Sequence, residues 1–210
     1  MEWFVRKEWL AISNLTERLK LIKPEIDDEI HQTIYDLAYN FEKLDEESDI
    51  YMESPPTHGY WKRNQRIWNS KCDIGTNLGW VNIREGMAAP VWSSLKSYNV
   101  NDLIVPTTNN GHYYICIQSG YSGVTEPIFP VTEGQTVEDI FGALTWQASV
   151  KRSIGDIVIP TFPNNRFYVC TVAGTSGSQE PEWSLVDGGT TTDGDVIWTG
   201  YRICVWKEAG

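Results

Sequence analysis

The sequence predicts an α+β protein in which an N-terminal helical segment is followed by tandem small all-β repeat modules. Three observations predict this fold class. Apolar residues recur at helical spacing within the first 50 residues, and from Gly59 onward short β-prone stretches alternate with Gly, Asn, Pro and Ser. Part of this β-prone region is also repeated at an offset of 54, the separation of Asp102 from Asp156.

Residues 1–50 are expected to form a helical anchoring and oligomerisation segment with two helices. The first is predicted to be amphipathic and to end before Pro24. The second is predicted to begin at Pro24, because proline suits the first position of a helix and the acidic residues that follow stabilise the positive end of the helix dipole. The apolar positions that mark the first helix are Trp9, Ile12, Leu15, Leu19 and Ile22.

The second helix carries an apolar seam with the spacing of a helix–helix interface. Two ways of burying this seam are open. It could pack within the chain, on the first helix or on a β module, or it could form an oligomeric bundle with the same helix of other subunits. We assign as the candidate oligomerisation seam the residues Ile30, Ile34, Leu37, Phe41 and Leu44.

The remaining chain is predicted to form three β modules: a divergent module at 51–96, a module at 97–148, and a module with a C-terminal strand at 149–210. At the offset of 54 the last two share tyrosines, cysteines and carboxylates. After a two-residue deletion, Trp146 aligns with Trp198. The matched pairs include Asp102 with Asp156, Tyr114 with Tyr168, Cys116 with Cys170, Glu126 with Glu180, and Asp139 with Asp193.

The divergent module aligns through fewer residues, with Trp80 in the place of Tyr114 and Trp92 in the place of Phe129. Each unit is predicted to be a β-hairpin followed by a Gly/Ser loop, an aromatic residue and a final short strand that carries a Trp. Such a unit is too small for a thick core. Its aromatic rings are therefore expected to fill it.

Charge and composition exclude several classes of partner. A net charge of −11 and a pI of about 4.7 repel a phosphate backbone, so no nucleic acid is expected to bind. The sequence shows no export signal and no apolar run long enough to cross a membrane, so membrane insertion is not expected. The four cysteines form no zinc pattern, and we expect no metal, no cofactor and buried free thiols.

No catalytic residues are predicted, and the protein is expected not to be an enzyme. The sequence contains neither HExxH nor G-x-S-x-G. Its paired carboxylates could suggest glycosidase chemistry, which needs two acids on either side of the scissile bond, but all of them belong to the repeat. Because an active site is seldom duplicated intact, the repeated residues are interpreted as structural.

The aromatic residues carry the remaining functional hypothesis, which is contact with carbohydrate. Ten tryptophans and ten tyrosines are present, and an exposed ring can stack on the face of a sugar. A wider set of rings that could be exposed in this way includes Trp68 and Trp80. The alternative is that most rings fill the cores of small modules, which is favoured for the repeat-matched Tyr114, Tyr168, Trp146 and Trp198. The rings that the repeat constrains least are the better candidates for contact. We assign as carbohydrate-contact candidates Tyr121, Tyr113, Trp92 and Trp183.

A resemblance to known proteins lies in four stretches, which run from Gly59 to Val81, from Gly155 to Pro160, from Phe167 to Gly177 and from Glu180 to Trp183. These stretches resemble a module that is common in tail, fibre and head-fibre proteins of tailed bacteriophages, and its layout is similar to that of small chitin-binding modules. The resemblance implies a virion structural protein, such as a tail fibre, a capsid decoration or a tail accessory, that assembles in the host cytoplasm.

The resemblance also implies partners. These are other virion proteins, further copies of the chain in a homo-oligomer with a trimer favoured, and a host-surface glycan contacted by the β modules during host attachment. One alternative is a purely architectural virion joint, which packs on neighbouring structural proteins and binds no sugar. Another is the targeting region of a wall-degrading enzyme, which would need a catalytic domain that these residues do not supply.

Overall fold

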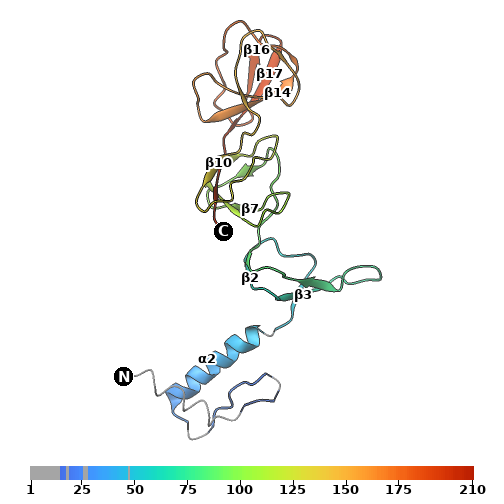
Figure 1. The fold of residues 1–210 in the computed structure, drawn as a ribbon, viewed down its shortest axis with the longest axis vertical. Helices are drawn as coiled ribbons and strands as arrows, with labels where there is room; N and C mark the ends of the chain where they lie inside the picture. The colour runs from blue at the N-terminus through green and yellow to red at the C-terminus, as the bar shows by residue number, and fades with distance from the viewer. Residues whose placement is uncertain (1–14, 18, 26–27, 47) are drawn as a thin grey trace. The chain divides into compact units, whose positions relative to one another are not determined.

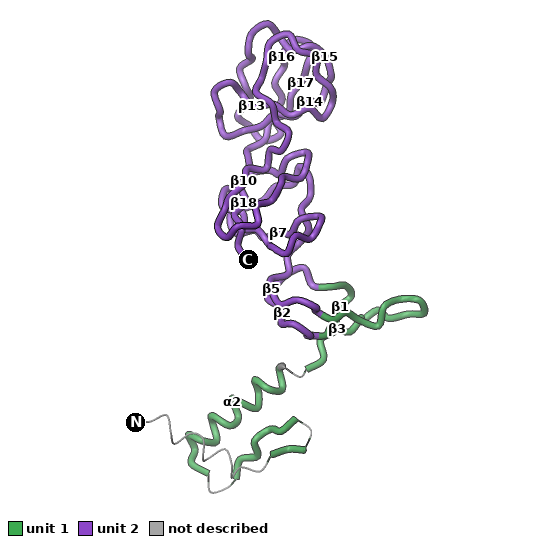
Figure 2. Tube along the Cα trace, viewed as in Figure 1, with its two compact units in different colours: residues 1–55, 66–81 green, residues 56–65, 82–210 purple. Residues whose placement is uncertain are grey.

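The computed structural model describes residues 15–17, 19–25, 28–46 and 48–210 (Figure 1). In this part of the chain one helix, α2 (Ile30–Glu46), precedes a series of small β-sheets. The predicted α+β fold, with an N-terminal helical segment followed by small β modules, is confirmed. By its internal contacts the chain divides into unit 1, residues 1–55 and 66–81, and unit 2, residues 56–65 and 82–210 (Figure 2).

The prediction of a helix ending before Pro24 is wrong for the described residues. Leu15 and Ile22 form an antiparallel β-bridge, and Lys20 between them has a positive φ of 56°, which an α-helix excludes. The reason is a tertiary contact. The Asn40 side chain accepts the Ile22 N–H and donates to the Ile22 carbonyl, both at 2.7 Å, and thereby takes both backbone groups of Ile22. Trp9 and Ile12 lie outside the described residues.

The second predicted helix is present as α2, but it begins at Ile30 rather than at Pro24. Before it, the Asp28 carboxylate accepts the Glu25 N–H at 2.7 Å. The Thr33 N–H donates to the Glu29 carbonyl at 3.0 Å, as expected where a helix starts. Glu25, Asp28 and Glu29 therefore precede the helix instead of lying in its first turn.

Unit 1 also contains a three-stranded sheet of order β1-β3-β4. β1 (Ile50–Met52) runs parallel to β3 (Arg66–Asn69), which pairs antiparallel with β4 (Gly79–Val81). Ile67 is buried in this sheet. Unit 2 begins with the antiparallel pair of β2 (Tyr60–Trp61) and β5 (Gly86–Met87).

The rest of unit 2 forms two β modules of the same construction, which we call module A (residues 90–143 and 203–210) and module B (residues 144–202). Module A contains β6 (Ser97–Tyr98), β7 (Leu103–Ile104), β8 (Tyr114–Gln118), β9 (Gly120–Tyr121), β10 (Thr136–Glu138) and β18 (Val205–Glu208). Module B contains β11 (Leu144–Thr145), β12 (Lys151–Arg152), β13 (Ile157–Ile159), β14 (Arg166–Val172), β15 (Gly174–Thr175), β16 (Thr190–Asp193) and β17 (Val196–Arg202).

The strand pairings of the two modules correspond one to one. In module A, β6 pairs with β9, β7 with β8, and β18 with both β8 and β10. In module B, β12 pairs with β15, β13 with β14, and β17 with both β14 and β16. β18 therefore has in module A the role that β17 has in module B.

The connection between these last two strands differs between the modules. In module B, β16 and β17 are joined by a tight turn at Gly194 and Asp195, and Gly194 has a positive φ of 61°. In module A, the whole of module B lies between β10 and β18 in the sequence. Module B is thus inserted into module A, and the C-terminal strand of the chain completes module A. The strand pairing assigns residues 203–210 to module A, whereas the sequence prediction grouped them with 149–202.

Each module has its own aromatic core. That of module A gathers around the fully buried Trp206, whose ring lies edge-on to that of Tyr98 with ring centres 4.8 Å apart. That of module B gathers around the fully buried Trp198 and Tyr168. A third cluster, which includes the fully buried Phe167 of β14, contains residues of both modules. Aromatic rings fill the small cores of both modules, as the sequence predicts.

Candidate functional site

A buried aspartate holds the core of each module together. The Asp139 Oδ2 accepts the indole N–H groups of Trp92 and Trp206, both at 2.8 Å, and its Oδ1 accepts the Gly123 N–H at 3.1 Å. Burial raises the pKa of the Asp139 carboxyl, and these three hydrogen bonds oppose the rise. With its acceptors occupied and no exposed surface, Asp139 is placed to hold strands rather than to meet a substrate.

Module B repeats this arrangement around Asp193. Its Oδ2 accepts the indole N–H of Trp146 at 2.8 Å and that of Trp198 at 3.0 Å, and its Oδ1 accepts the Gly177 N–H at 2.7 Å. A side chain at Gly177 would crowd this aspartate, since its Cβ would lie 3.0 Å from the Asp193 Oδ1.

These bonds correct two alignments made from the sequence. Trp146 corresponds to Trp92, at the offset of 54, and not to Trp198. Trp198 corresponds instead to Trp206, which lies after the inserted module. Trp92 therefore belongs to the framework of module A and does not take the place of Phe129.

The other repeated carboxylates also bind backbone groups. Glu126 accepts the Thr107 N–H at 2.8 Å, and Glu180 accepts the Thr161 N–H at 2.9 Å. A second repeated pair of acids lies earlier in the two modules. Asp102 in module A accepts the Asn99 N–H at 2.8 Å, and Asp156 in module B accepts the Ser153 N–H at 2.9 Å. Each repeated acid thus closes a turn or a loop.

The four carbohydrate-contact candidates are all half-buried, and each has a structural contact. Trp92 is bonded to Asp139, as described above. The ring of Trp183 lies 4.2 Å from that of Tyr168, and its indole N–H donates to Glu180 at 2.9 Å. Tyr121 packs on Tyr201 with ring centres 4.9 Å apart, in the cluster shared by both modules. The backbone of Tyr113 pairs with that of Ala209 and Gly210. The four rings therefore belong to different parts of unit 2.

A groove in unit 1 is lined by residues that include two tryptophans, Trp68 and Trp80, which the sequence placed only in the wider set. It has a volume of about 170 Å³ and is lined by Arg66, Ile67, Trp68, Leu78, Gly79, Trp80 and Val81, which come from β3, β4 and the residue before β4. Trp68 is 38% exposed, and its indole N–H donates to Asp49 at 2.9 Å, which fixes the orientation of the ring. An oriented, exposed ring can stack on a sugar, and an exposed arginine beside it can donate hydrogen bonds to the same sugar.

The apolar seam of α2 is exposed along its whole length. Its five side chains are between 41% and 77% exposed, with Leu44 and Ile30 at the two ends of this range. The side chains that α2 directs to its own chain are polar, since Asp36 and Asn40 are buried and Asn40 bonds Ile22. Within the described residues, unit 1 therefore covers a polar face of α2 and leaves the seam uncovered.

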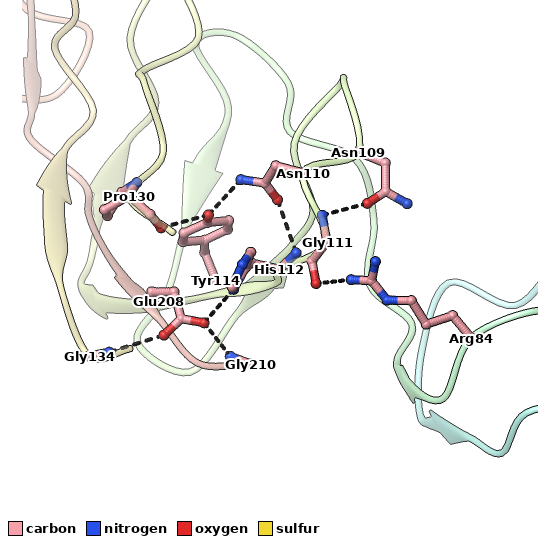
Figure 3. A network of polar contacts seen from close by, with 10 residues as sticks. All are labelled: Arg84, Asn109, Asn110, Gly111, His112, Tyr114, Pro130, Gly134, Glu208 and Gly210. Atoms are coloured by element: carbon pink, nitrogen blue, oxygen red, sulfur yellow. Dashed lines mark hydrogen bonds and ion pairs between the residues drawn. The ribbon is translucent and has the colours of Figure 1, made fainter. Parts of the chain in front are cut away.

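A polar network fastens the last strand of module A (Figure 3). The Glu208 carboxylate, which is almost completely buried, contacts the Nδ1 of His112 at 2.9 Å and accepts the N–H groups of Gly134 and Gly210 at 3.0 and 2.8 Å. Next to it, the Tyr114 hydroxyl donates to the Pro130 carbonyl at 2.8 Å. Tyr168 makes the equivalent bond in module B, which marks this tyrosine as framework.

The Glu208 network predicts an acid-sensitive module A. The hydrogen bond with His112 lowers the pKa of Glu208 from its usual value of 4.5. A carboxyl whose pKa is lower in the folded state stabilises the fold above its unfolded pKa, and this contribution is lost as the pH falls through the folded pKa. We expect the unfolding midpoint of module A to fall as the pH is lowered below 4.5, and Glu208→Gln to reduce this dependence.

Thermal unfolding measured between pH 6 and pH 3, followed by near-ultraviolet circular dichroism, tests this. The raised pKa of Asp139 acts in the opposite sense, so the difference between the wild type and Glu208→Gln is the informative quantity. Equal acid dependence in the two proteins would contradict the role assigned to Glu208.

The described residues contain neither a metal-binding cluster nor a helix that could span a membrane. No group of three or more His, Cys, Asp or Glu side chains in this part of the chain is placed to hold a metal ion. Within the same residues, the one helix found is not long and apolar enough to cross a membrane. Comparison of the chain with protein-family models, with curated proteins and with solved structures gives no match.

Proposed function

We propose that the protein is a structural component of a tailed-bacteriophage virion, a fibre, decoration or tail accessory, which assembles as a homo-oligomer through α2. The observation that supports this most is the exposed seam of α2, together with the buried polar residues on another side of the same helix. A trimer is favoured, as the resemblance implies. Its further partners are other virion proteins, and its place is the virion, after assembly in the host cytoplasm.

Association through the seam is favourable in energy. Complete burial of one Ile, Leu or Phe side chain contributes about 1.5–3 kcal/mol. Because the five seam residues are already partly covered, their burial contributes roughly 5 kcal/mol per subunit. A trimer forms in two association steps, each costing about 4–15 kcal/mol, so the roughly 15 kcal/mol from three seams offsets these costs in the lower part of that range.

Replacement of a seam residue by a charged one is expected to dissociate the oligomer. Phe41→Asp places a carboxylate in the apolar interface, where it has no partner and loses its hydration. We expect the wild type to sediment at about three times the chain mass of 23.9 kDa at micromolar concentration, and Phe41→Asp to sediment at the mass of one chain. Tyr35→Asp is the control, since Tyr35 is equally exposed on α2 but lies off the seam.

Sedimentation equilibrium makes the measurement, with circular dichroism to confirm that both variants keep their fold. A wild type that stays a single chain across the micromolar range would count against assembly through α2. So would dissociation of Tyr35→Asp to the same degree as Phe41→Asp.

The contact with host-surface carbohydrate is a second step of the proposal, and we assign it to the groove of unit 1. Trp68 lines this groove, and Arg66, two residues before it on the same face of β3, supplies hydrogen-bond donors beside it. Trp68 is 38% exposed, whereas the four candidates chosen from the sequence are all half-buried, so its ring is the more accessible one. The alternative is an architectural joint, in which the same groove packs on a neighbouring virion protein.

Glycan-array binding distinguishes the two. For a sugar-binding protein we expect Trp68→Ala to reduce binding about 5- to 150-fold, taking for a stacked sugar the roughly 1–3 kcal/mol that a nucleobase gains on an aromatic ring. Phe162→Ala is the control, since Phe162 of module B is 86% exposed and lies outside the groove. An array with no binding by a correctly folded wild type would support the architectural joint instead.

A further inference from the structure

Two of the cysteines meet in the core of module A. The Sγ atoms of Cys116 and Cys204 lie 3.5 Å apart, and both side chains are completely buried. Cys116 is on β8, and Cys204 directly precedes β18. Both are free thiols in the structure, as are the buried Cys170 and the exposed Cys72. A disulfide requires the two sulfur atoms to approach to about 2.05 Å, so a shift of about 1.5 Å would join them.

Module B contains the same site with one thiol replaced. Cys170 occupies on β14 the position of Cys116 on β8, and both thiols donate to the carbonyl two residues further along the chain. Val196 stands two residues before Trp198, as Cys204 stands two residues before Trp206. Val196 is as completely buried as Cys204. The sheet therefore accommodates an aliphatic side chain at this position, and the second thiol of module A is not needed to fill the core.

The two cysteines lie on either side of the inserted module. They are 88 residues apart in the sequence, and all of module B lies between them. A covalent bond between them would tie the returning C-terminal segment to β8. In the folded protein the same segment is held only by non-covalent contacts, such as the ladder with β8 and the Glu208 network.

We propose that Cys116 and Cys204 form a disulfide under oxidising conditions, and that this bond locks module A closed around its C-terminal strand. The proposal does not depend on the proposed function of the protein. It applies to any setting in which the folded chain meets a disulfide oxidant such as oxidised glutathione.

The reaction proceeds by thiol–disulfide exchange. The Cys116 thiolate attacks one sulfur of oxidised glutathione, which forms a mixed disulfide and releases one glutathione thiolate. The Cys204 thiolate then attacks the Cys116 sulfur and displaces the second glutathione. Two cysteine thiols are oxidised to one disulfide, one glutathione disulfide is reduced to two thiols, and the two cysteine protons pass to the glutathione thiolates through solvent.

The two thiols differ in acidity while module A is closed. The hydrogen bond from Cys204 then lowers the pKa of the Cys116 thiol and burial opposes this, whereas the pKa of Cys204 is raised by the same contact and by burial. Because both thiols are buried, glutathione reaches them only when β18 detaches or before module A has closed. Oxidation should therefore be slow in the native protein and faster in dilute urea.

The test uses the full chain with Cys72→Ser, which removes the exposed thiol and with it disulfides between chains. The protein is incubated with oxidised glutathione in dilute urea, at a concentration at which alkylation of reduced Cys116 and Cys204 goes to completion. The free thiols are then alkylated and the peptides are mapped by mass spectrometry. We expect a cross-linked pair of peptides containing Cys116 and Cys204, which separates on reduction with dithiothreitol.

The effect of the disulfide on the stability of module A is measured by thermal unfolding of the oxidised protein after the urea is removed. We expect the midpoint of module A to rise by about 5–10 °C relative to the reduced protein, because the cross-link restricts the unfolded chain. Cys204→Val, which copies module B, should show neither the cross-link nor the rise. Cys170→Val, a matched change of a buried thiol, should show both.

Two results would overturn the proposal. The first is complete alkylation of Cys116 and Cys204 after the oxidant has acted under these conditions. The second is a cross-link that leaves the midpoint unchanged or lowers it, which would show that the bond does not lock module A.

Discussion

Deletion of residues 203–210 is expected to unfold module A and to leave module B folded. β18 lies between β10 and β8, so its removal breaks two ladders of backbone hydrogen bonds. It also removes Trp206, the central ring of the core, and loss of a buried Trp side chain alone costs about 3–5 kcal/mol. Module B is complete between Leu144 and Arg202 and loses none of its own strands.

Hydrogen exchange resolved by peptide measures this directly. We expect amides of β7 and β8 to lose their protection in the truncated chain, while those of β14 and β17 keep most of theirs. Removal of Ala209 and Gly210 alone is the control, because it spares β18. Loss of protection in both modules would show that module B depends on module A, contrary to the nested arrangement.

Replacement of either buried aspartate is expected to be the most destabilising single substitution of a polar residue. Asp139→Ala leaves two indole N–H groups and the Gly123 N–H without their acceptor. A buried donor without a partner costs about 1–3 kcal/mol, so we expect a loss of about 3–5 kcal/mol in the free energy of unfolding. Asp193→Ala should destabilise module B by a similar amount, because its three donors are equivalent.

Urea unfolding followed by tryptophan fluorescence measures both changes, since the affected rings report their own module. Asp139→Asn should lose less than Asp139→Ala, because the amide keeps one acceptor oxygen. Glu138→Ala is the matched control, as Glu138 is the exposed neighbour of Asp139 and should change the free energy by less than about 0.5 kcal/mol. A loss equal to that of the control would refute the anchoring role of Asp139.

Local patterns in the sequence predicted what depends on local structure. The spacing of Ile34, Leu37 and Phe41 identified the one helix in the described residues, because a helix repeats at short range. The helix expected before Pro24 failed for the opposite reason. Leu15 to Ile22 also has helical spacing, but the fold of this segment is decided by Asn40, which lies 18 residues beyond Ile22.

The repeat predicted the framework of the modules but not their nesting. The alignment at an offset of 54 matches residues in sequence order. β18, the strand that completes module A, follows all of module B in the sequence and lies outside that alignment. A signal was present in the spacing of Cys204 before Trp206, which matches that of Val196 before Trp198. The framework role of Trp92 was likewise unpredictable from its neighbours, because its hydrogen-bond partner Asp139 is 47 residues away.

The nested order of strands has a consequence for synthesis on the ribosome. Domains generally fold as they emerge, the N-terminal ones first. Here module A cannot be completed first, because β18 is translated only after all of module B. Module B can fold as soon as Arg202 has left the exit tunnel, and its folding brings the two ends of the interrupted module near each other. The inserted module would thus assist the folding of module A, because it shortens the loop that must close when β18 pairs with β8 and β10.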